Sequence, residues 1–229
     1  MSSDFLKHTV FFIAKNYDTI KEKYEGLGGS RMIEIRAYEE KDENQWLRCR
    51  VVSFLDCSYY NDVLQEKEQY ENENISLVAE ENGKIVGFID IEIEEKSGEL
   101  CVAGEERGAV IWHLGVLPEY RREGVAVRLW NTAKEQLHKK GISYCEVWTQ
   151  EDEPANHWYR SQGFVNQKEH NWLRCYARPS KKEWFLKEEN TGEIYGVEEM
   201  IFEVKTERRT EVQPYCYRMD EVRLYSQKI

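Results

Sequence analysis

The chain lacks any long apolar run, and this absence bears on how it could meet a membrane. Its N-terminal apolar patch, residues 10–14, is far shorter than the roughly 20 residues that a membrane-spanning helix needs. A small-residue cleavage site of the secretory kind is also missing there. We therefore expect a cytoplasmic protein that does not bind a membrane.

Metal-binding cysteine pairs are missing as well. The sequence has no CxxC pair and no cluster of cysteine and histidine at the spacing of a zinc site. We therefore expect no metal, and we expect most cysteines to be small buried residues in a reducing compartment. The six cysteines are Cys49, Cys57, Cys101, Cys145, Cys175 and Cys216.

Positive charge is scarce relative to negative charge. The 229 residues include 32 Lys and Arg against 43 Asp and Glu, which gives a net charge of −11. We therefore expect no broad binding to nucleic acid. Such a field suits a cationic small molecule or peptide, and it equally suits a surface that only keeps a protein in solution. The 41% of apolar residues can fill the core of one domain with appendages.

The two common nucleotide-binding loops are absent too. A Walker loop needs GxxxxGK[ST], and a dinucleotide-binding fold needs GxGxxG after its first strand; the chain has neither at the relevant place. Residues 109–129 nevertheless predict a strand, a basic loop with one glycine, and a helix start. The N-terminus of a helix offers free N–H groups to a phosphate. Gly124 and the small Ala126 would let the backbone approach a pyrophosphate closely.

Elsewhere the periodicity predicts a mixed fold of strands and helices. In residues 84–94, isoleucines alternate with acidic residues, which predicts one buried and one more solvated face. An Asn82-Gly83 pair before this strand indicates a hairpin. A strand–helix–strand unit around residue 130 predicts a parallel pair. We expect strands at 32–38, 75–80, 84–94, 109–117, 142–149 and from 164, and helices at 39–54, to about 70, to about 140 and from 154 to about 162.

The two ends of the chain are expected to be separate from the central domain. Residues 1–30 predict an amphipathic helix whose apolar face packs either on the domain or on a second copy of the chain, as in a homodimer. Residues 179–229 predict a β-rich appendage that partly completes the sheet. Its expected extended segments are 183–186, 195–205, 212–217 and 221–225. The central domain is then residues 31–178.

Two motifs at matching positions make the chain resemble the GNAT superfamily of N-acetyltransferases. Residues 121–126 have the form R-x-x-G-x-A, and residues 155–164 have the form A-x-x-x-Y-x-x-x-G-F. The resemblance covers about residues 32–176. It implies an α/β (α+β) fold with a mixed, mostly antiparallel central sheet, a splayed parallel strand pair and flanking helices.

The resemblance implies acetyl-CoA as co-substrate and identifies residues that would hold it. Pantetheine would lie along the strand that carries Leu114 and Val116, and the pyrophosphate would lie on the glycine loop. In place of a family asparagine the chain has Asp152, which can cap the helix but puts a CoA contact there in question. The predicted cofactor-binding residues are Leu114, Val116, Arg121, Arg122, Glu123, Gly124, Val125, Ala126, Val127 and Asn156.

The catalytic groups are only partly specified. Tyr159 occupies the family's thiolate-protonating position. Some members carry a glutamate where this chain has Val110, so the base is open: Glu146 is our choice, with water and the carboxylates of residues 90 and 92 as alternatives. His113 lies an odd number of positions after Val110, so in a regular strand it is expected to face the other side.

The acceptor pocket of this fold lies between the connection of the first two helices and the splayed strands. Aromatic rings beside carboxylates would suit an ammonium group, although ordinary packing also explains such residues. The predicted walls are Tyr59, Tyr60, Trp112 and Trp148, with Asp56 and Asp62. We therefore expect an N-acetyltransferase that acts on a primary amine of a small molecule or peptide. The alternative is a catalytically silent acyl-CoA-binding sensor or assembly module.

Overall fold

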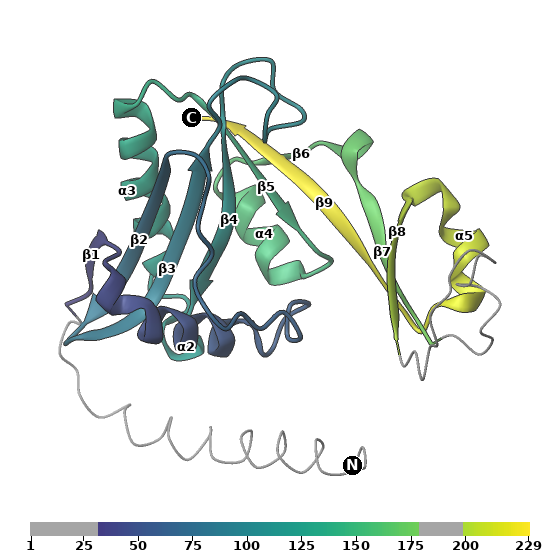
Figure 1. The fold of residues 1–229 in the computed structure, drawn as a ribbon, viewed down its shortest axis with the longest axis horizontal. Coiled ribbons are helices and arrows are strands. Elements are labelled where there is room, and N and C mark those ends of the chain that lie inside the picture. The colour runs from purple at the N-terminus through teal and green to yellow at the C-terminus, as the bar shows by residue number, and fades with distance from the viewer. Residues whose placement is uncertain (1–31, 179–198) are drawn as a thin grey trace, which may run out of the picture.

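The computed structural model describes residues 32–178 and 199–229 of the chain (Figure 1). The predicted N-terminal helix of residues 1–30, the extended segment 183–186 and the start of the segment 195–205 lie outside these residues. Neither described range contains a helix with the length and apolar character that a bilayer crossing requires.

A single sheet organises the described residues. Its strands follow the order β1-β2-β3-β4-β5-β9-β7-β8, and the short β6 pairs with β9. Only β4 and β5 run parallel, so the predicted mixed, mostly antiparallel sheet with one parallel pair is confirmed. The strands are β1 (Glu34–Ala37), β2 (Asn74–Glu81), β3 (Lys84–Ile93), β4 (Ala109–Val116), β5 (Tyr144–Thr149), β6 (Val165–Asn166), β7 (Trp172–Ala177), β8 (Met200–Lys205) and β9 (Arg218–Lys228).

Helices pack on both faces of this sheet. A β-carbon built on Gly87 of β3 would meet Val125 and Leu129, whereas one built on Gly115 of β4 would meet Phe88 and Ser53. The first pair belongs to α3 and the last residue belongs to α2, so these two helices cover opposite faces. The helices are α2 (Glu43–Phe54), α3 (Val125–Lys139), α4 (Glu153–Ser161) and α5 (Arg209–Val212), with short 3₁₀ turns at η1 (Glu40–Asp42), η2 (Pro118–Tyr120), η3 (Lys168–His170), η5 (Thr206–Arg208) and η6 (Gln213–Tyr215).

Local sequence signals explain the boundaries that were predicted. Asn82 and Gly83 have φ of 51° and 80°, so both take the left-handed conformation that a tight hairpin needs. Helix α3 buries Trp130, Ala133 and Leu137 against the sheet, as its periodicity predicts, although Val127 is only half-buried.

The carboxylate face of β3 differs from the prediction. Asp90, Glu92 and Glu94 were expected on a more solvated face, yet all three are buried. Each is compensated by donors that the sequence pattern does not reveal: Glu94, for example, accepts hydrogen bonds from the backbone N–H groups of Glu99, Leu100, Cys101 and Gly108. The loop of residues 95–108 therefore covers this face at Glu94.

Two further predictions of secondary structure are wrong. No helix forms between residues 62 and 73; that segment is irregular and is held by polar contacts, such as that of Asp62 with Arg50 and that of Glu68 with His113. Residues 212–217 were expected to be extended, but they include the end of α5 and the 3₁₀ turn η6. Buried Val212 packs there on Leu173 and Cys175 of β7, and Pro214 begins the turn.

The C-terminal strand β9 lies inside the sheet. It pairs with β5 along Tyr144–Thr149 on one side and with β7 on the other. Figure 1 shows β7, β8 and α5 standing away from β1–β4, with the long β9 as the connection. Residues near the end of the sequence therefore support β5, which forms one wall of the site described next.

Candidate active site

Strands β4 and β5 diverge, and a pocket opens where they part. They pair only where Ala109–Ile111 faces Cys145–Val147. At this point β4 contains a bulge: Ile111 pairs with Ile91 and His113 with Asp90, so Trp112 is an extra residue without a partner on β3. Beyond the bulge, β4 stays with β3, and no strand of the described residues pairs with its other edge.

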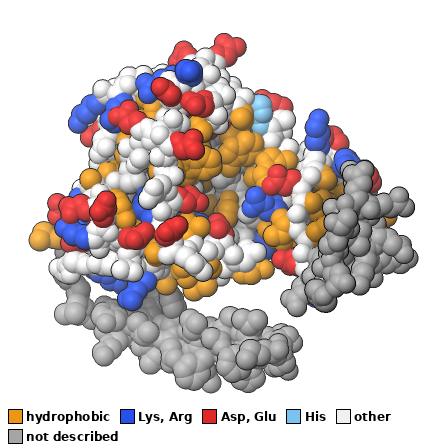
Figure 2. Space-filling view, viewed as in Figure 1, with side chains coloured by type: hydrophobic (Ala, Val, Ile, Leu, Met, Phe, Trp, Pro, Cys, Tyr) orange, Lys and Arg blue, Asp and Glu red, His pale blue; other side chains and the backbone are white. Residues whose placement is uncertain are grey.

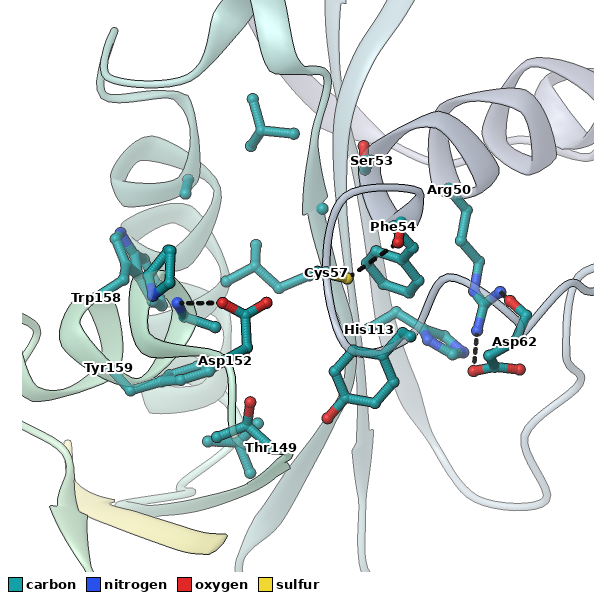
Figure 3. Close-up of a pocket in the computed structure, with 18 of the residues that line it drawn as sticks. Arg50, Ser53, Phe54, Cys57, Asp62, His113, Thr149, Asp152, Trp158 and Tyr159 are labelled. Carbon is teal, nitrogen blue, oxygen red and sulfur yellow. Dashed lines mark hydrogen bonds and ion pairs between the residues drawn. The ribbon is translucent and has the colours of Figure 1, made fainter. Parts of the chain in front are cut away.

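The pocket between the diverging strands has a volume of about 350 Å³ and is lined by β4, β5, α2 and α4. Figure 3 shows two facing sides, with Trp158, Tyr159 and Asp152 on one and Arg50, Asp62 and His113 on the other. In Figure 2 hydrophobic side chains gather around a hollow in the middle of the described surface. Ten predicted site residues line the pocket: Asp56, Tyr59, Asp62, Trp112, Leu114, Val116, Arg121, Ala126, Trp148 and Tyr159.

The predicted pyrophosphate loop lies at the N-terminus of α3, next to this pocket. Gly124 is the N-cap residue with φ of +77°, and Arg122 before it has φ of 67°. No side chain caps this helix, and its first turn contains no acidic residue. The first amides of a helix have no partner within the helix, and the helix dipole favours an anion beside them. The loop therefore fits a phosphate group.

Arg121 and Arg122 differ in what they contact. The guanidinium of Arg121 lies 2.7 Å from Asp56 Oδ2 and donates to the carbonyl of Ser53 at 2.8 Å. It therefore joins the end of β4 to the end of α2. Arg122 and Glu123 are exposed in the loop, whereas Val125 is buried against the sheet and can offer only its backbone.

Tyr159 projects from α4 into the pocket. Asp152 caps this helix by accepting from the backbone N–H of Ala155, and Pro154 lies in its first turn, so both fix where the helix starts. The ring of Tyr159 is only 7% exposed and stacks on Tyr225 at 6.1 Å. Burial raises the pKa of its phenol well above the usual value, so the hydroxyl keeps its proton at neutral pH.

Asn156 lies on the same helix but does not line the pocket. Its side-chain N–H groups donate to the carbonyls of Gln150 and Asp152, at 2.8 and 2.6 Å. Its Oδ1 accepts from the hydroxyl of Tyr225 at 3.0 Å and from Arg223 at 3.2 Å. Because its polar atoms bond within the protein, Asn156 joins α4 to the end of β5 and to β9. Its place in the structure therefore does not support the predicted contact of Asn156 with the cofactor.

Glu146, our predicted base, lies outside the pocket. It pairs with Val110 in the part of the sheet where β4 and β5 are still joined, and it is fully buried. Its carboxylate accepts from the backbone N–H groups of Val102 and Ala103 at 2.9 and 2.8 Å and from the hydroxyl of Tyr144 at 2.7 Å. Glu146 therefore holds the 95–108 loop and does not line the pocket that contains Tyr159.

His113 lines the pocket, although regular alternation along the strand predicts that it faces away from Val110. Cross-strand partners share a face, and Val110 pairs with Glu92 while His113 pairs with Asp90. Residues 90 and 92 are two apart on β3, so they share a face as well. The bulge at Trp112 thus turns His113 to the face of Val110. There its Nε2 lies 2.8 Å from Oε2 of Glu68.

Sequence reasoning missed Arg50 and Glu68. Arg50 is 1% exposed and donates to the carboxylate of Asp62 at 2.8 Å. Glu68 is 45 residues from His113 in the sequence and lies in the segment expected to be helical. No motif links either pair, so only the folded chain reveals them.

The residues predicted to form the acceptor walls differ in what they contact. Tyr59 accepts a hydrogen bond from the backbone N–H of Gln150 at 2.8 Å, and burial raises the pKa of its phenol to about 12. Trp112 is 44% exposed and donates its indole N–H to Glu92, while Trp148 packs on Trp172. Tyr60 lies outside the pocket.

Comparisons with known proteins agree with this fold. The sequence matches the family model described as "Acetyltransferase (GNAT) family" over residues 35–164. N-alpha-acetyltransferase 60 of Danio rerio is 30% identical over 134 residues, which are 52% of this chain and 51% of that protein. The chain thus spans about half the length of this curated relative.

Solved structures show the same fold at low sequence identity. The ribosomal-protein-S18-alanine N-acetyltransferase from Escherichia coli has a TM-score of 0.50 and 14% identity, over 86% of this chain and 94% of that one. A GNAT-family acetyltransferase from Streptococcus pneumoniae has a TM-score of 0.51 and 16% identity, over 86% of this chain and all (100%) of that one. At these identities the likeness concerns the fold alone.

Proposed function

This chain belongs to the GNAT acetyltransferase family, and from that membership we propose that it moves the acetyl group of acetyl-CoA directly to a primary amine. The observation that carries the proposal is the pocket between the diverging strands. It contains a protonated, buried tyrosine, and it opens beside a helix N-terminus that fits a phosphate.

The donor would lie along β4. The open edge of this strand, from Leu114 to Val116, would pair with the pantetheine amides as an added strand would. The first amides of α3, after Gly124, would hold the pyrophosphate, and exposed Arg122 would add positive charge. This arrangement leaves the thioester near Tyr159.

The chemistry is a direct transfer. The lone pair of a neutral amine attacks the thioester carbonyl carbon, so that a C–N bond forms and the C–S bond breaks. The leaving thiolate then takes a proton from the phenol of Tyr159. A tyrosine phenol keeps its proton at neutral pH because its ordinary pKa is about 10, so Tyr159 would act as the acid and regain its proton from solvent.

The acceptor is proposed to be a peptide α-amine or a small primary amine. One relative is named an N-alpha-acetyltransferase, and the net charge of −11 favours cationic acceptors. Trp112 and Trp148 would supply apolar walls for the acceptor, since both line the pocket. The six cysteines are all free, which supports a reducing, cytoplasmic location.

A screen of amines tests this function. The purified chain is mixed with acetyl-CoA and a panel of N-terminal peptides, polyamines, aminoglycosides and amino acids, and released CoA thiol is measured. Turnover with at least one acceptor, and an acetylated product of the expected mass, supports transfer. Tight CoA binding without turnover across the panel would instead support the silent acyl-CoA-binding module, which the apolar Val110 in place of a carboxylate favours.

A further inference from the structure

We propose that His113 is the proton acceptor for the incoming amine and that Glu68 orients it; this inference rests on the proposed acetyl transfer. A primary amine is mostly an ammonium ion at neutral pH and cannot attack a thioester until it loses a proton. Glu146 cannot take that proton, because it lies outside the pocket and its carboxylate holds backbone N–H groups. A different group is therefore needed inside the pocket.

His113 lies where such a group is required. It lines the pocket and stands on the side opposite Tyr159 and Trp158 (Figure 3). The imidazole is 8% exposed and packs edge-on against the ring of Trp46 at 5.7 Å. A base on one wall and an acid on the other would let the amine and the thiol leaving group lie between them.

The contact with Glu68 decides which ring nitrogen can accept a proton. The hydrogen bond from His113 holds the pKa of the Glu68 carboxyl below its usual value, so this carboxylate is ionised at neutral pH and can only accept. Nε2, at 2.8 Å from Glu68 Oε2, must therefore carry the hydrogen of the neutral ring. Among the described residues none forms a hydrogen bond to Nδ1, which keeps its lone pair.

Lys67, the residue before Glu68, anchors the segment that carries this carboxylate. Its ammonium lies 2.9 Å from Asp90 Oδ1 and is 8% exposed. It lies over three aromatic rings, at 4.9 Å from the ring centre of Tyr38, 5.3 Å from Trp46 and 5.0 Å from Tyr70. The cage fixes an otherwise irregular segment to α2 and β3.

Charged groups from two elements lie around His113. The carboxylate of Glu68 faces it directly, and Asp90 is its cross-strand partner on β3. Asp90 is paired with Lys67, and the guanidinium of Arg50 is paired with Asp62 in the same pocket. Glu68 is therefore the charge that offsets an imidazolium most directly.

In the proposed reaction each proton passes to a named group or to solvent. Nδ1 of His113 takes one proton from the ammonium and the ring becomes an imidazolium beside Glu68. The neutral amine then forms the C–N bond as the C–S bond breaks. The tetrahedral nitrogen releases its second proton to solvent, and the thiolate takes the Tyr159 proton. The imidazolium then returns its proton to solvent, and Tyr159 takes one proton back from solvent.

The pH profile of the His113→Gln variant tests this assignment. With an acceptor from the amine panel, we expect kcat to fall about 100-fold at neutral pH, which is the lower end of general-base contributions. The deficit should shrink as the pH rises, because solvent then deprotonates the amine. Affinity for CoA, measured by calorimetry, should stay unchanged. The exposed His157 on α4 supplies the control His157→Gln, which should behave as wild type.

Glu68→Gln separates orientation from mere packing. It should lower kcat about 10-fold and move the acid limb of the profile to lower pH, because the imidazolium loses its carboxylate. Wild-type rates and an unchanged profile in His113→Gln, with an active parent protein, would overturn the assignment while leaving acetyl transfer intact. A parent protein that acetylates no amine overturns both. Folding of each variant is checked by its thermal midpoint.

Discussion

Val110 and His113 lie on the same face of β4, although three positions separate them in the sequence. The extra residue between them, Trp112, shifts the alternation by one and donates its indole N–H to Glu92 at 2.8 Å. The bulge has two consequences at once: it ends the pairing of β4 with β5, and it brings an imidazole into the space that opens. The pocket and its candidate base thus have one structural cause.

Replacing Tyr159 by phenylalanine should lower kcat about 100-fold or more while leaving CoA affinity unchanged. The hydroxyl is proposed to protonate the thiolate, and among the described residues no hydrogen bond ties it into the fold, so the ring packing on Tyr225 should persist. Steady-state kinetics and calorimetry measure the two effects. The matched control is Tyr215→Phe, because Tyr215 is exposed and does not line the pocket. Unaltered turnover in Tyr159→Phe would remove the proposed role.

Gly124→Val should weaken CoA binding more than it lowers stability. A β-carbon at Gly124 meets no atom within 4 Å, so the cost arises from its φ of +77°, which a β-branched residue tolerates poorly. We expect a loss of about 1–3 kcal/mol in folding and at least a tenfold loss in CoA affinity, because the loop amides move.

A second glycine separates strain from binding. Gly83 has a similar φ of +80° and equally open surroundings, but it lies in the β2–β3 hairpin. Gly83→Val should therefore cost similar stability and leave CoA affinity unchanged. Equal CoA affinity in Gly124→Val and the wild type would contradict the assignment of the loop.

Local signals in the sequence predicted most of the fold but only part of the site. The Asn82-Gly83 turn, the stripe of α3 and the start of α4 each depend on neighbouring residues, and each was predicted. Contacts between distant residues were not. Asp90 looked like part of a solvated face because nothing in its strand reveals Trp46 or Lys67.

The position of the candidate base shows the same limit. A strand alternates with a period of two until a bulge adds a residue, and residues 109–114 include no glycine or proline to mark one. Glu146 has a carboxylate on the strand next to β4, but this carboxylate accepts from backbone N–H groups of the 95–108 loop and holds that loop in place. For both His113 and Glu146, contacts between residues that are distant in the sequence determine where the side chain lies.

Lys67→Met should destabilise the protein by about 3–5 kcal/mol, because it leaves the buried carboxylate of Asp90 without its counter-charge. Denaturation in urea measures the loss. Adding Asp90→Asn should recover part of it, since the charge that lacked a partner is then removed. The exposed pair of Lys84 and Glu119 gives a contrast: Lys84→Met should cost about 1 kcal/mol or less. Similar losses in both single variants would contradict the role of the caged ion pair.

Glu94→Gln should flatten the loss of stability in acid. Burial opposes the charge of Glu94, but backbone N–H groups of Cys101, Leu100, Gly108 and Glu99 outweigh it and lower the pKa of its carboxyl. A carboxyl whose folded pKa is lowered stabilises the protein above its unfolded pKa of about 4.3 and loses that contribution as the pH falls through the folded pKa. Without the charge, stability at neutral pH should fall by about 2–3 kcal/mol, and the difference from wild type should vanish in strong acid. Urea denaturation across this pH range, with exposed Glu95→Gln as control, measures it; a constant difference at every pH would show that packing alone is responsible.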